Sequence, residues 1–259
     1  MSTPESGAGG TLSTPTVADL LVVIPAWNEE AALPSVLQEL SRVAPDTPVV
    51  VVSDGSRDGT AAVARRHAVP VIELPFNLGV GGAMRAGFVY AQRHGFSYVA
   101  QLDADGQHDP AELAALCDAM RQTGADVVVG SRFHGDGNYR VRGPRRWAMV
   151  SLAAAISRIA RTRLTDITSG YKLLGPRAVA LFAREYPVEY LGDTVEALVL
   201  AVRAGLLVRQ TPVHMRRRQG GEPSHSPIKA AVFLVRATLS VSLAMTRPRL
   251  RETGHGHGA

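Results

Sequence analysis

The chain has 259 residues, of which 46% are hydrophobic and 20% are charged, as in ordinary folded domains. This composition excludes a largely disordered chain, and the single cysteine, Cys117, excludes an intrachain disulfide and any need for an oxidising compartment. The formal net charge is +5, and most of the basic residues follow residue 130, so nucleic acid, anionic lipid and phosphorylated substrates are all compatible partners.

The two ends of the chain differ in composition from its middle. Residues 1–18 are rich in Ser, Thr, Pro and Gly and lack the basic start and apolar run of a secretory signal, which predicts a disordered leader. Residues 19–227 are expected to form the folded domain, and residues 248–259 a flexible tail. The segment between them, 228–247, is apolar but interrupted by Lys229 and Arg236, which favours an amphipathic helix on a membrane surface over a spanning helix. A helix packed on the domain fits this segment equally well.

In the first half of the chain, short apolar segments alternate with segments of helical periodicity. In chain order the predicted elements are strand 20–24, helix 29–43, strand 49–52, helix 58–67, strand 71–74, helix 79–94, strand 98–102, helix 110–122 and strand 127–129. This alternation predicts an α/β fold, with a mostly parallel, Rossmann-like sheet covered by helices on both faces. After residue 130 the alternation is lost, and the expected elements there are a basic-flanked helix at 145–163, a helix containing Asp193, and a strand at 206–212.

The polar motifs PAWNEE, SDGSRDGT, NLGVGGA and DADGQHDP follow the first four predicted strands. Ligands of parallel α/β sheets bind beyond the carboxyl ends of the strands, so these loops form the candidate site. In the last motif Asp103, Asp105 and Gln107 occupy alternate positions and offer hard oxygen ligands for Mg²⁺ or Mn²⁺, which would stabilise charge on a leaving diphosphate. A solvated turn whose aspartate caps the next helix is the alternative.

The other loops offer groups for a nucleotide. Asp54 follows the second strand and can accept from a base N–H or a ribose hydroxyl, whereas Asp58 is expected to cap the next helix. Trp27 is suited to stacking on a base and Glu29 to holding a ribose, but acidic residues at a helix start are also favoured by the helix dipole. The glycines of NLGVGGA permit a tight turn, and the spacing of a dinucleotide-binding GxGxxG motif is absent there.

In order and spacing, the motifs PAWNEE, VSDGSRDGT, NLGVGGAMRAG, LDADGQHDP, GSRF and DITSGYK resemble glycosyltransferase family 2 over about residues 19 to 230. Within this family, the motifs resemble more narrowly those of the dolichol-phosphate mannosyltransferase and polyprenyl-phosphate glycosyltransferase branch. It implies a GT-A fold, a nucleotide-diphosphate-sugar donor linked to UDP or GDP, and inversion at the anomeric carbon. Trp27 stands where this branch commonly has Tyr, and Ser53 where an Asp is frequent, so the identity of the base stays open.

The resemblance also implies roles for individual residues. The nucleotide would be bound by Pro25, Trp27, Glu29 and Asp54, and the metal and diphosphate by Asp103, Asp105 and Gln107. Catalytic roles would fall to Asp105, to Arg132 facing phosphate groups, to Asp166 in the segment beside the acceptor, and to Asp193. In the stretch HMRRRQGGEPSHS the acceptor or donor phosphate would be held by the arginines Arg216 to Arg218, with Arg217 at their centre, and by Ser224 or Ser226, because arginine supplies paired donors.

Asp193 and Glu196 lie three residues apart and therefore share one side of their predicted helix. In relatives with hydroxyl acceptors, an acidic residue in this region serves as the general base. A lipid phosphate would not need such a base, because its second pKa of about 6 leaves it a nucleophilic anion at neutral pH.

The sequence thus predicts a metal-dependent inverting glycosyltransferase that passes a sugar to polyprenyl phosphate at the cytoplasmic face of the cell membrane. An anionic membrane surface is an expected partner, and a membrane-protein partner or a homo-oligomer is compatible with this prediction. Two alternatives stay open: a family 2 enzyme acting on a soluble glycan, protein or small molecule, and a non-catalytic nucleotide-sugar-binding protein. Nucleic acid is disfavoured as a partner, because aromatic residues, on which single strands stack, make up only 5% of the chain.

Overall fold

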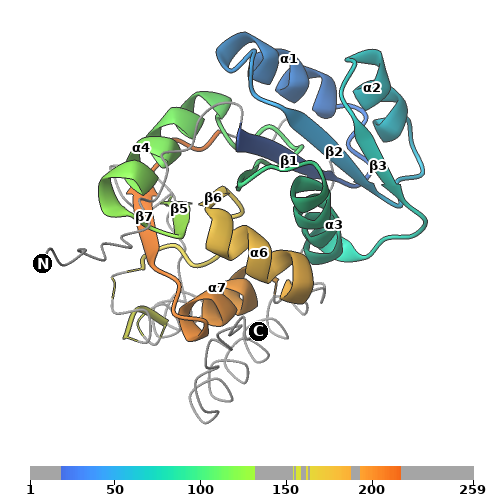
Figure 1. Cartoon of the computed structure of the whole chain (residues 1–259). Helices are drawn as coiled ribbons and strands as arrows, with labels where there is room; N and C mark the ends of the chain where they lie inside the picture. The colour runs from blue at the N-terminus through green and yellow to red at the C-terminus, as the bar shows by residue number, and fades with distance from the viewer. Residues whose placement is uncertain are drawn as a thin grey trace, which may run out of the picture.

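The computed structural model of the chain describes residues 19–131, 154, 156–158, 162, 164–187 and 193–216. Within these residues, seven strands form one sheet in the order β3-β2-β1-β4-β6-β5-β7, with helices on both faces (Figure 1). The strands are β1 Leu20–Ala26, β2 Val49–Asp54, β3 Val71–Leu74, β4 Tyr98–Gln101, β5 Val127–Ser131, β6 Lys172–Leu174 and β7 Val208–Pro212. The helices are α1 Leu33–Val43, α2 Thr60–Arg66, α3 Gly79–Arg93, the short η2 Pro110–Glu112, α4 Leu113–Thr123, α6 Pro176–Glu185 and α7 Asp193–Arg203.

Neighbouring strands run parallel except at β6, which is antiparallel to both β4 and β5. The predicted α/β fold, with a mostly parallel sheet and helices on both faces, is therefore confirmed. Because β6 runs in the opposite direction to β4, the residues just before β6 reach the edge of the sheet at which β4 ends. This reversal brings the motif DITSGYK beside the motif DADGQHDP.

Side chains alternate between the two faces of the sheet, and each face has its own apolar core. On one face, Leu21 and Val23 of β1 belong to a cluster with Phe88 of α3 and with residues of α6 and α7. On the other face, Val22 and Ile24 belong to a cluster with α1, α2 and α4. These strand residues are almost completely buried, as expected for a parallel sheet covered on both sides. The two cores fix the strands and thereby the loops that follow them.

Two predicted helices begin later than expected, and a third is divided. The helix predicted at 29–43 begins at Leu33, because the Glu29 N–H donates to Thr60 Oγ1 (2.9 Å) and holds this segment against the loop after β2. The helix predicted at 58–67 begins at Thr60, whose N–H donates to Asp58 Oδ1 (3.0 Å). The helix predicted at 110–122 is divided into η2 and α4. The acidic residues at these helix starts consequently lie in the loops of the candidate site.

The second half of the described chain contains two elements that the sequence pattern does not predict. β6 has only three residues, too few to show a hydrophobic period, and α6 follows it directly. The expected helix around Asp193 and the strand at 206–212 correspond to α7 and β7. The predicted leader 1–18, most of the predicted helix 145–163, and the segments 228–247 and 248–259 lie outside the described residues. Among the helices that are described, none is long and apolar enough to cross a bilayer.

Candidate active site

The loops after β1, β2, β3 and β4 meet at one edge of the sheet, because these strands are parallel neighbours (Figure 1). They are the loops that contain the four polar motifs. Along the edge the order is NLGVGGA after β3, SDGSRDGT after β2, PAWNEE after β1 and DADGQHDP after β4. Motifs that are far apart in the sequence are therefore assembled into one candidate site.

The loops after β1 and β2 are hydrogen-bonded to each other. Asn28, with φ of +55°, donates its N–H to Ser56 Oγ (3.2 Å), and its Oδ1 accepts from the Arg57 N–H (2.8 Å). Trp27, the residue before, is 48% exposed, so its ring is open to a planar ligand. Pro25 is buried within β1. The nucleotide-binding residues predicted in PAWNEE thus stand on a loop that a second loop supports.

Asp54 ends β2 and is only 3% exposed, and its Oδ1 accepts from the Leu78 N–H at 2.7 Å. Burial raises the pKa of this carboxyl above its ordinary value, although hydrogen bonds from the backbone of Leu78 and Gly79 oppose the shift. The next residue, Gly55, has φ of +63°, and a Cβ added there would lie 2.5 Å from the backbone of the loop after β3. The loops after β2 and β3 are therefore packed too closely for any residue except glycine at this position.

Asp58, in the same loop, accepts hydrogen bonds from neighbouring residues of the fold through both of its carboxylate oxygens. Its Oδ1 accepts from the Thr60 N–H (3.0 Å) and hydroxyl (2.5 Å), and its Oδ2 accepts from the Glu30 N–H (3.1 Å). Burial by itself would raise the pKa of Asp58, but these hydrogen bonds outweigh it and hold the pKa below its ordinary value. Asp58 therefore orders the turn before α2 and is a structural residue, although the N-cap of the helix is Gly59 and not Asp58 as predicted.

Asp105 is held from both sides by Gln107. The Gln107 N–H donates to Asp105 Oδ1 at 2.9 Å and the Gln107 Nε2 donates to Asp105 Oδ2 at 2.8 Å, while Asp105 is 6% exposed. This arrangement fixes the carboxylate plane of Asp105. The prediction that Gln107 is itself a metal ligand remains untested, and the role visible in its contacts is to orient Asp105.

Asp103 is more open, with 35% of its side chain exposed, and His108 and Gly170 lie against it. Its N–H donates to His108 Nδ1 (3.0 Å), which places the proton of a neutral imidazole on Nε2, and Nε2 lies 3.4 Å from Asp103 Oδ2. Gly170 lies against the same carboxylate, because an added Cβ would approach Asp103 Oδ2 to 2.9 Å. Tyr171 stacks on the His108 ring at a centroid distance of 4.7 Å and an angle of 10°.

His108, and the contacts that Gly170 and Tyr171 make with the DADGQHDP loop, were not predicted from the sequence. Tyr171 is fully buried, and its hydroxyl donates to the Asp109 backbone oxygen at 2.9 Å. The sequence offers one indication of their importance, namely that these residues lie inside the motifs LDADGQHDP and DITSGYK. The antiparallel pairing of β6 with β4, which brings the two motifs together, could not be inferred from that position.

The carboxylate pair fits a divalent cation that binds together with a diphosphate. Mg²⁺ is usually held through one or two carboxylates and completes its coordination with water and substrate phosphates. Asp103 and Asp105 supply hard oxygen ligands in that number. Within the described part of the chain, no group of three or more His, Cys, Asp or Glu side chains could hold a metal ion by itself. The remaining ligands of a cation at Asp103 and Asp105 would therefore come from water and the diphosphate.

Asp166 lies in the turn before β6 and is 1% exposed. Its Oδ1 accepts from the Thr168 N–H (3.2 Å) and hydroxyl (3.1 Å), and its backbone oxygen accepts from Gln210 Nε2 (2.7 Å). These contacts hold the turn that leads to Gly170. Asp166 is thus placed beside the candidate site, and its catalytic role stays a prediction.

Arg216, the first arginine of the run after β7, does not face an open phosphate site. Its guanidinium is bonded to both carboxylate oxygens of Glu39 on α1 (2.5 and 2.8 Å) and to Asp109 Oδ2 (2.7 Å). Arg132, Arg217 and Ser224 lie outside the described residues, and of Asp193 only the backbone, at the start of α7, is described.

A mostly parallel sheet with helices on both faces, and with a DxD carboxylate pair at the carboxyl edge of its strands, defines the GT-A class of glycosyltransferases. The sequence model of Glycosyl transferase family 2 matches residues 21–185, and the chain belongs to that family. It is therefore a glycosyltransferase, with the fold that the sequence predicted.

Two relatives with similar sequences indicate to which branch of the family the chain belongs. Polyprenol monophosphomannose synthase of Mycolicibacterium smegmatis is 33% identical over 255 residues, which cover 91% of this chain and 94% of the relative. Undecaprenyl-phosphate mannosyltransferase of Micrococcus luteus is 35% identical over 217 residues, covering 80% of this chain and 87% of the relative. The chain thus falls in the polyprenyl-phosphate glycosyltransferase branch, as its motifs indicate.

Among solved structures, the fold is similar to that of glucosyl-3-phosphoglycerate synthase from Mycobacterium tuberculosis, solved with Mn²⁺, uridine diphosphate and glucosyl-3-phosphoglycerate. The TM-score is 0.68 at 18% sequence identity, and the match covers 95% of this chain and 88% of that one. At this identity the likeness concerns the fold alone.

Proposed function

We propose that this glycosyltransferase transfers a sugar from a UDP- or GDP-linked donor to polyprenyl phosphate, with inversion at the anomeric carbon, in a reaction that needs Mg²⁺ or Mn²⁺. One observation carries the proposal: β2 and β4 bring Asp54, Asp103 and Asp105 to one edge of the sheet, where other residues of the chain fix all three carboxylates. The acceptor is inferred from relatives whose names specify polyprenol and undecaprenyl phosphate.

In the donor half, the chain's own residues bind and orient. Asp54 would accept from the base or ribose, and the exposed Trp27 would stack on the base. Asp103 and Asp105 would hold the cation against the diphosphate. When bound, the cation supplies positive charge that stabilises the leaving nucleoside diphosphate. A structural neighbour that was solved with Mn²⁺ and uridine diphosphate supports this donor half.

In the acceptor half, a phosphate group reduces what the protein must supply. A phosphate monoester with a second pKa of about 6 is largely a dianion at neutral pH and needs no general base. One of its oxygens forms the bond to the anomeric carbon from the face opposite the diphosphate, while the carbon–oxygen bond to the diphosphate breaks and its electrons leave with the nucleotide. Asp166 and Asp193 would then position the acceptor region, with Arg132, Arg217 and Ser224 as the proposed phosphate contacts.

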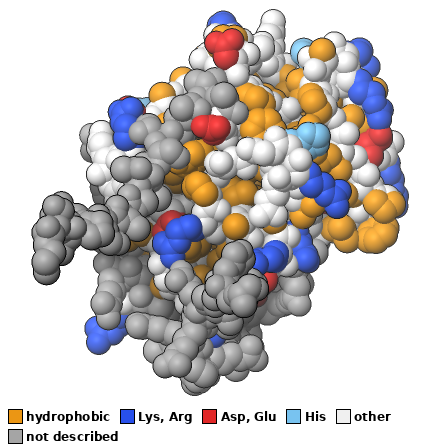
Figure 2. Space-filling view, viewed as in Figure 1, with side chains coloured by type: hydrophobic (Ala, Val, Ile, Leu, Met, Phe, Trp, Pro, Cys, Tyr) orange, Lys and Arg blue, Asp and Glu red, His pale blue; other side chains and the backbone are white. Residues whose placement is uncertain are grey.

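We place the reaction at the inner face of the cell membrane, where the basic residues after residue 130 would meet anionic lipid. On the face shown in Figure 2, the described Lys and Arg side chains lie at several separate places on the surface. Flotation with anionic liposomes, compared with neutral liposomes, measures the membrane contact.

The test of the function is a transfer assay with the purified chain, UDP- and GDP-linked hexoses, and a short-chain polyprenyl phosphate. With one of the donors we expect a polyprenyl monophosphate sugar, detected by mass spectrometry, and its loss on addition of EDTA. Asp103→Asn should lower the rate about 100-fold, because the cation would lose a charged ligand. Asp118→Asn is the control, since this exposed carboxylate on α4 forms a local ion pair with Arg121.

Transfer to water-soluble acceptors but not to the lipid would replace the proposed acceptor with a soluble one. Binding of the donor without transfer or hydrolysis, under every metal tested, would identify a non-catalytic nucleotide-sugar-binding protein. Equal rates with and without EDTA would remove the metal from the proposal.

A further inference from the structure

A groove lies between strand β3 and helix α3, on the sheet face that α3, α6 and α7 cover. β3 is an edge strand of the sheet. On this face Val50 and Val52 of β2 are completely buried, whereas Ile72 and Leu74 of β3 are only half-buried. The layer formed by the described helices therefore ends before the sheet does, and a groove of about 490 Å³ is left along its margin.

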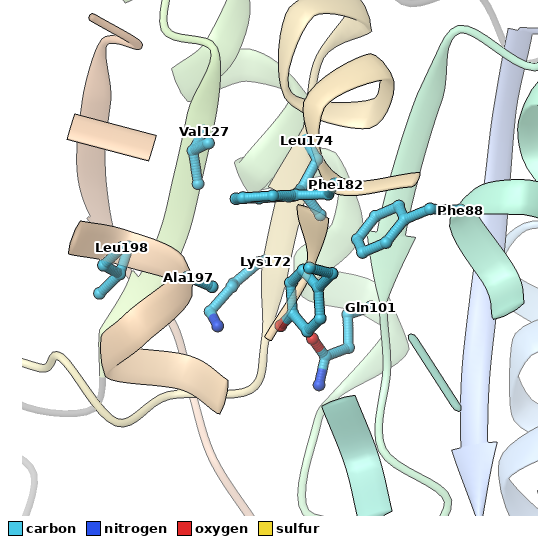
Figure 3. A pocket seen from close by; sticks show the side chains of 9 residues that line it. Phe88, Gln101, Val127, Lys172, Leu174, Phe182, Ala197 and Leu198 are labelled. Atoms are coloured by element: carbon cyan, nitrogen blue, oxygen red, sulfur yellow. The ribbon is translucent and has the colours of Figure 1, made fainter. Parts of the chain in front are cut away.

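The size of this groove distinguishes it from a second cavity, which lies between the sheet and helices α6 and α7 (Figure 3). That cavity is lined by Lys172, Gln101 and apolar side chains. Its volume is about 10 Å³, which is room for one water molecule at most. The groove beside α3 falls in the size range of sites that bind organic molecules, so it can accept part of another molecule.

The floor of the groove is apolar. On α3, the residues Gly82, Ala86 and Val89 recur every three or four positions and therefore lie on one side of the helix. From β3, the alternate residues Ile72 and Leu74 face the same groove. An apolar stripe is thus open to the surroundings along the length of α3.

The charged side chains of the groove are of one sign. Arg85, Arg93 and His94 line it, and all three are exposed. Among its described lining residues there is no carboxylate. The acidic residue of β3, Glu73, belongs to the opposite face of the sheet, where it pairs with Arg65 of α2. The groove is therefore complementary to an anionic partner with an apolar part.

We propose that this groove docks on an anionic lipid bilayer, with its apolar floor against the acyl boundary and with Arg85 and Arg93 bound to lipid phosphates. The two arginines are eight residues apart, about 12 Å along the helix axis, so they can meet separate headgroups. An apolar stripe bordered by arginine is typical of helices that lie on anionic membranes. A polar small molecule fits less well, because the described side chains of the floor offer it no hydrogen bonds.

Docking through this groove sets the candidate active site beside the membrane. The groove begins at the loop after β3, where Leu78 lines it and the Leu78 N–H donates to Asp54 Oδ1 at 2.7 Å. The docked side therefore borders the edge of the sheet at which the donor would bind. On the side of the molecule where α3 and β3 lie, Figure 2 shows hydrophobic, basic and histidine side chains next to one another. The inference rests on the proposed function in that the acceptor phosphate lies in the headgroup layer.

The experiment is flotation of the purified chain with vesicles of phosphatidylcholine, with and without phosphatidylglycerol. Arg85→Gln combined with Arg93→Gln removes both charges from the groove. The matched control is Arg42→Gln combined with Arg66→Gln, which removes two charges from the last turns of α1 and α2 on the other face of the sheet.

For the groove pair we expect the partition coefficient on phosphatidylglycerol vesicles to fall about 10- to 30-fold, as two arginines contribute near an anionic surface. The control pair should stay within about threefold of the wild-type chain, because attraction to the surface potential falls off within a Debye length. Equal effects of the two pairs overturn the inference. Wild-type flotation that does not depend on phosphatidylglycerol overturns it as well.

Arg85 also donates to the Arg184 backbone oxygen on α6 at 2.8 Å, so a second variant is needed if the groove pair does not fold. Ala86→Glu then decides, because it places a negative charge on the apolar stripe and keeps a strong helix former. Ala62→Glu, at an exposed position of α2, is its control. Flotation of Ala86→Glu at the level of Ala62→Glu overturns the inference. A wild-type dimer that Ala86→Glu converts to a monomer, measured by light scattering, would make a second copy of the chain the occupant instead.

Transfer assays separate this inference from the proposed function. The groove variants should retain transfer to a short-chain polyprenyl phosphate in solution and lose transfer to a long-chain polyprenyl phosphate in vesicles. A wild-type chain that transfers to neither acceptor contradicts the proposed function, whereas the flotation result is independent of transfer. Groove variants that act on the vesicle-bound acceptor at the wild-type rate contradict the docking.

Discussion

At the scale of single residues, the same side chain has different roles according to its surroundings. Asp54 and Asp58 lie in one loop, yet the pKa of Asp54 is raised, chiefly by burial, whereas hydrogen bonds to Thr60 and Glu30 outweigh burial and lower that of Asp58. A carboxylate that is kept in an unfavourable environment beside a candidate site indicates a functional group. A carboxylate whose two oxygens both accept hydrogen bonds from neighbouring loop residues indicates a structural one.

Exchange of each aspartate for asparagine should separate these roles. Asp58→Asn is expected to lower the free energy of unfolding at neutral pH by about 1 kcal/mol, because an amide cannot accept at both former oxygens. Asp54→Asn should not lower it, since it removes a buried charge, but it should weaken nucleotide binding. Urea denaturation and calorimetry on the two variants measure both quantities, and equal effects of the two exchanges would contradict the assignment.

The pH dependence has opposite signs for the two residues. The pKa of Asp58 is lower in the folded chain, so its contribution to stability is present above the unfolded pKa and is lost as the pH falls through the folded value. The pKa of Asp54 is higher in the folded chain, so its contribution is present below the unfolded pKa and is lost as the pH rises through the folded value. The stability lost in Asp58→Asn should therefore shrink in acid, and any gain in Asp54→Asn should shrink as well.

Single residues could be predicted where a motif and a strand end coincide. Asp54, Asp103 and Asp105 were located in this way, and the structure brings them to one edge of the sheet. His108 was not identified as a site residue. Its role depends on two contacts with Asp103 and on stacking with Tyr171, which is distant in the sequence. Contacts between distant segments have no signature in the local spacing of residues.

At the scale of elements, Arg216 ties three parts of the fold together. It joins the segment after β7 to Glu39 on α1 and to Asp109, and its own N–H donates to the Gln107 backbone oxygen at 2.9 Å. The hydrogen bonds to Glu39 and Asp109 raise the pKa of the guanidinium, which therefore stays charged. The loop that carries Asp105 is thus braced from outside by the end of β7.

Arg216→Met should lower the free energy of unfolding by about 1–2 kcal/mol, because a bidentate, partly buried ion pair with a second carboxylate is lost. Arg121→Met is the control, because it removes one exposed pair with Asp118 and should change stability by less than about 0.5 kcal/mol. Urea denaturation at low and high salt measures both. Equal losses in the two variants would show that Arg216 does not brace the loop.

Most elements with a clear hydrophobic period were predicted from the sequence. Strands β1 to β5 and helices α1 to α4 follow the alternation in the sequence, with helix starts that differ by a few residues because loops hold the polar side chains. β6 was missed, since a strand as short as Lys172–Leu174 owes its existence to pairing on both sides and to no pattern of its own. α6 was missed although its buried residues Ala178, Val179, Phe182 and Ala183 have helical spacing.

At the scale of the whole molecule, ligand binding and folding are linked. The site is built from loops on β1 to β4 and from the turn before β6, so a ligand that spans it binds only the folded chain. Such a ligand raises the free energy of unfolding by about 2.7 kcal/mol at one hundred times its dissociation constant. The size of this effect depends on whether the cation and the nucleotide bind together.

We expect the nucleoside diphosphate of the correct base, with Mn²⁺, to raise the melting temperature by several degrees, and EDTA to cancel most of this increase. Neither Mn²⁺ alone nor the nucleotide alone should reproduce it, because the described residues offer a carboxylate pair and no complete metal site. Differential scanning fluorimetry with UDP and GDP measures the effect and identifies the base. A full shift with Mn²⁺ alone would point to a preformed metal site.

The reversed direction of β6 also sets an order of assembly. During synthesis the strands β1 to β4, with the motif DADGQHDP, leave the ribosome well before Gly170 and Lys172. A nascent chain that ends before residue 170 therefore has the aspartates of the donor half without Gly170, which lies against the Asp103 carboxylate. The donor half alone would therefore lack one of the contacts that orient its carboxylate pair.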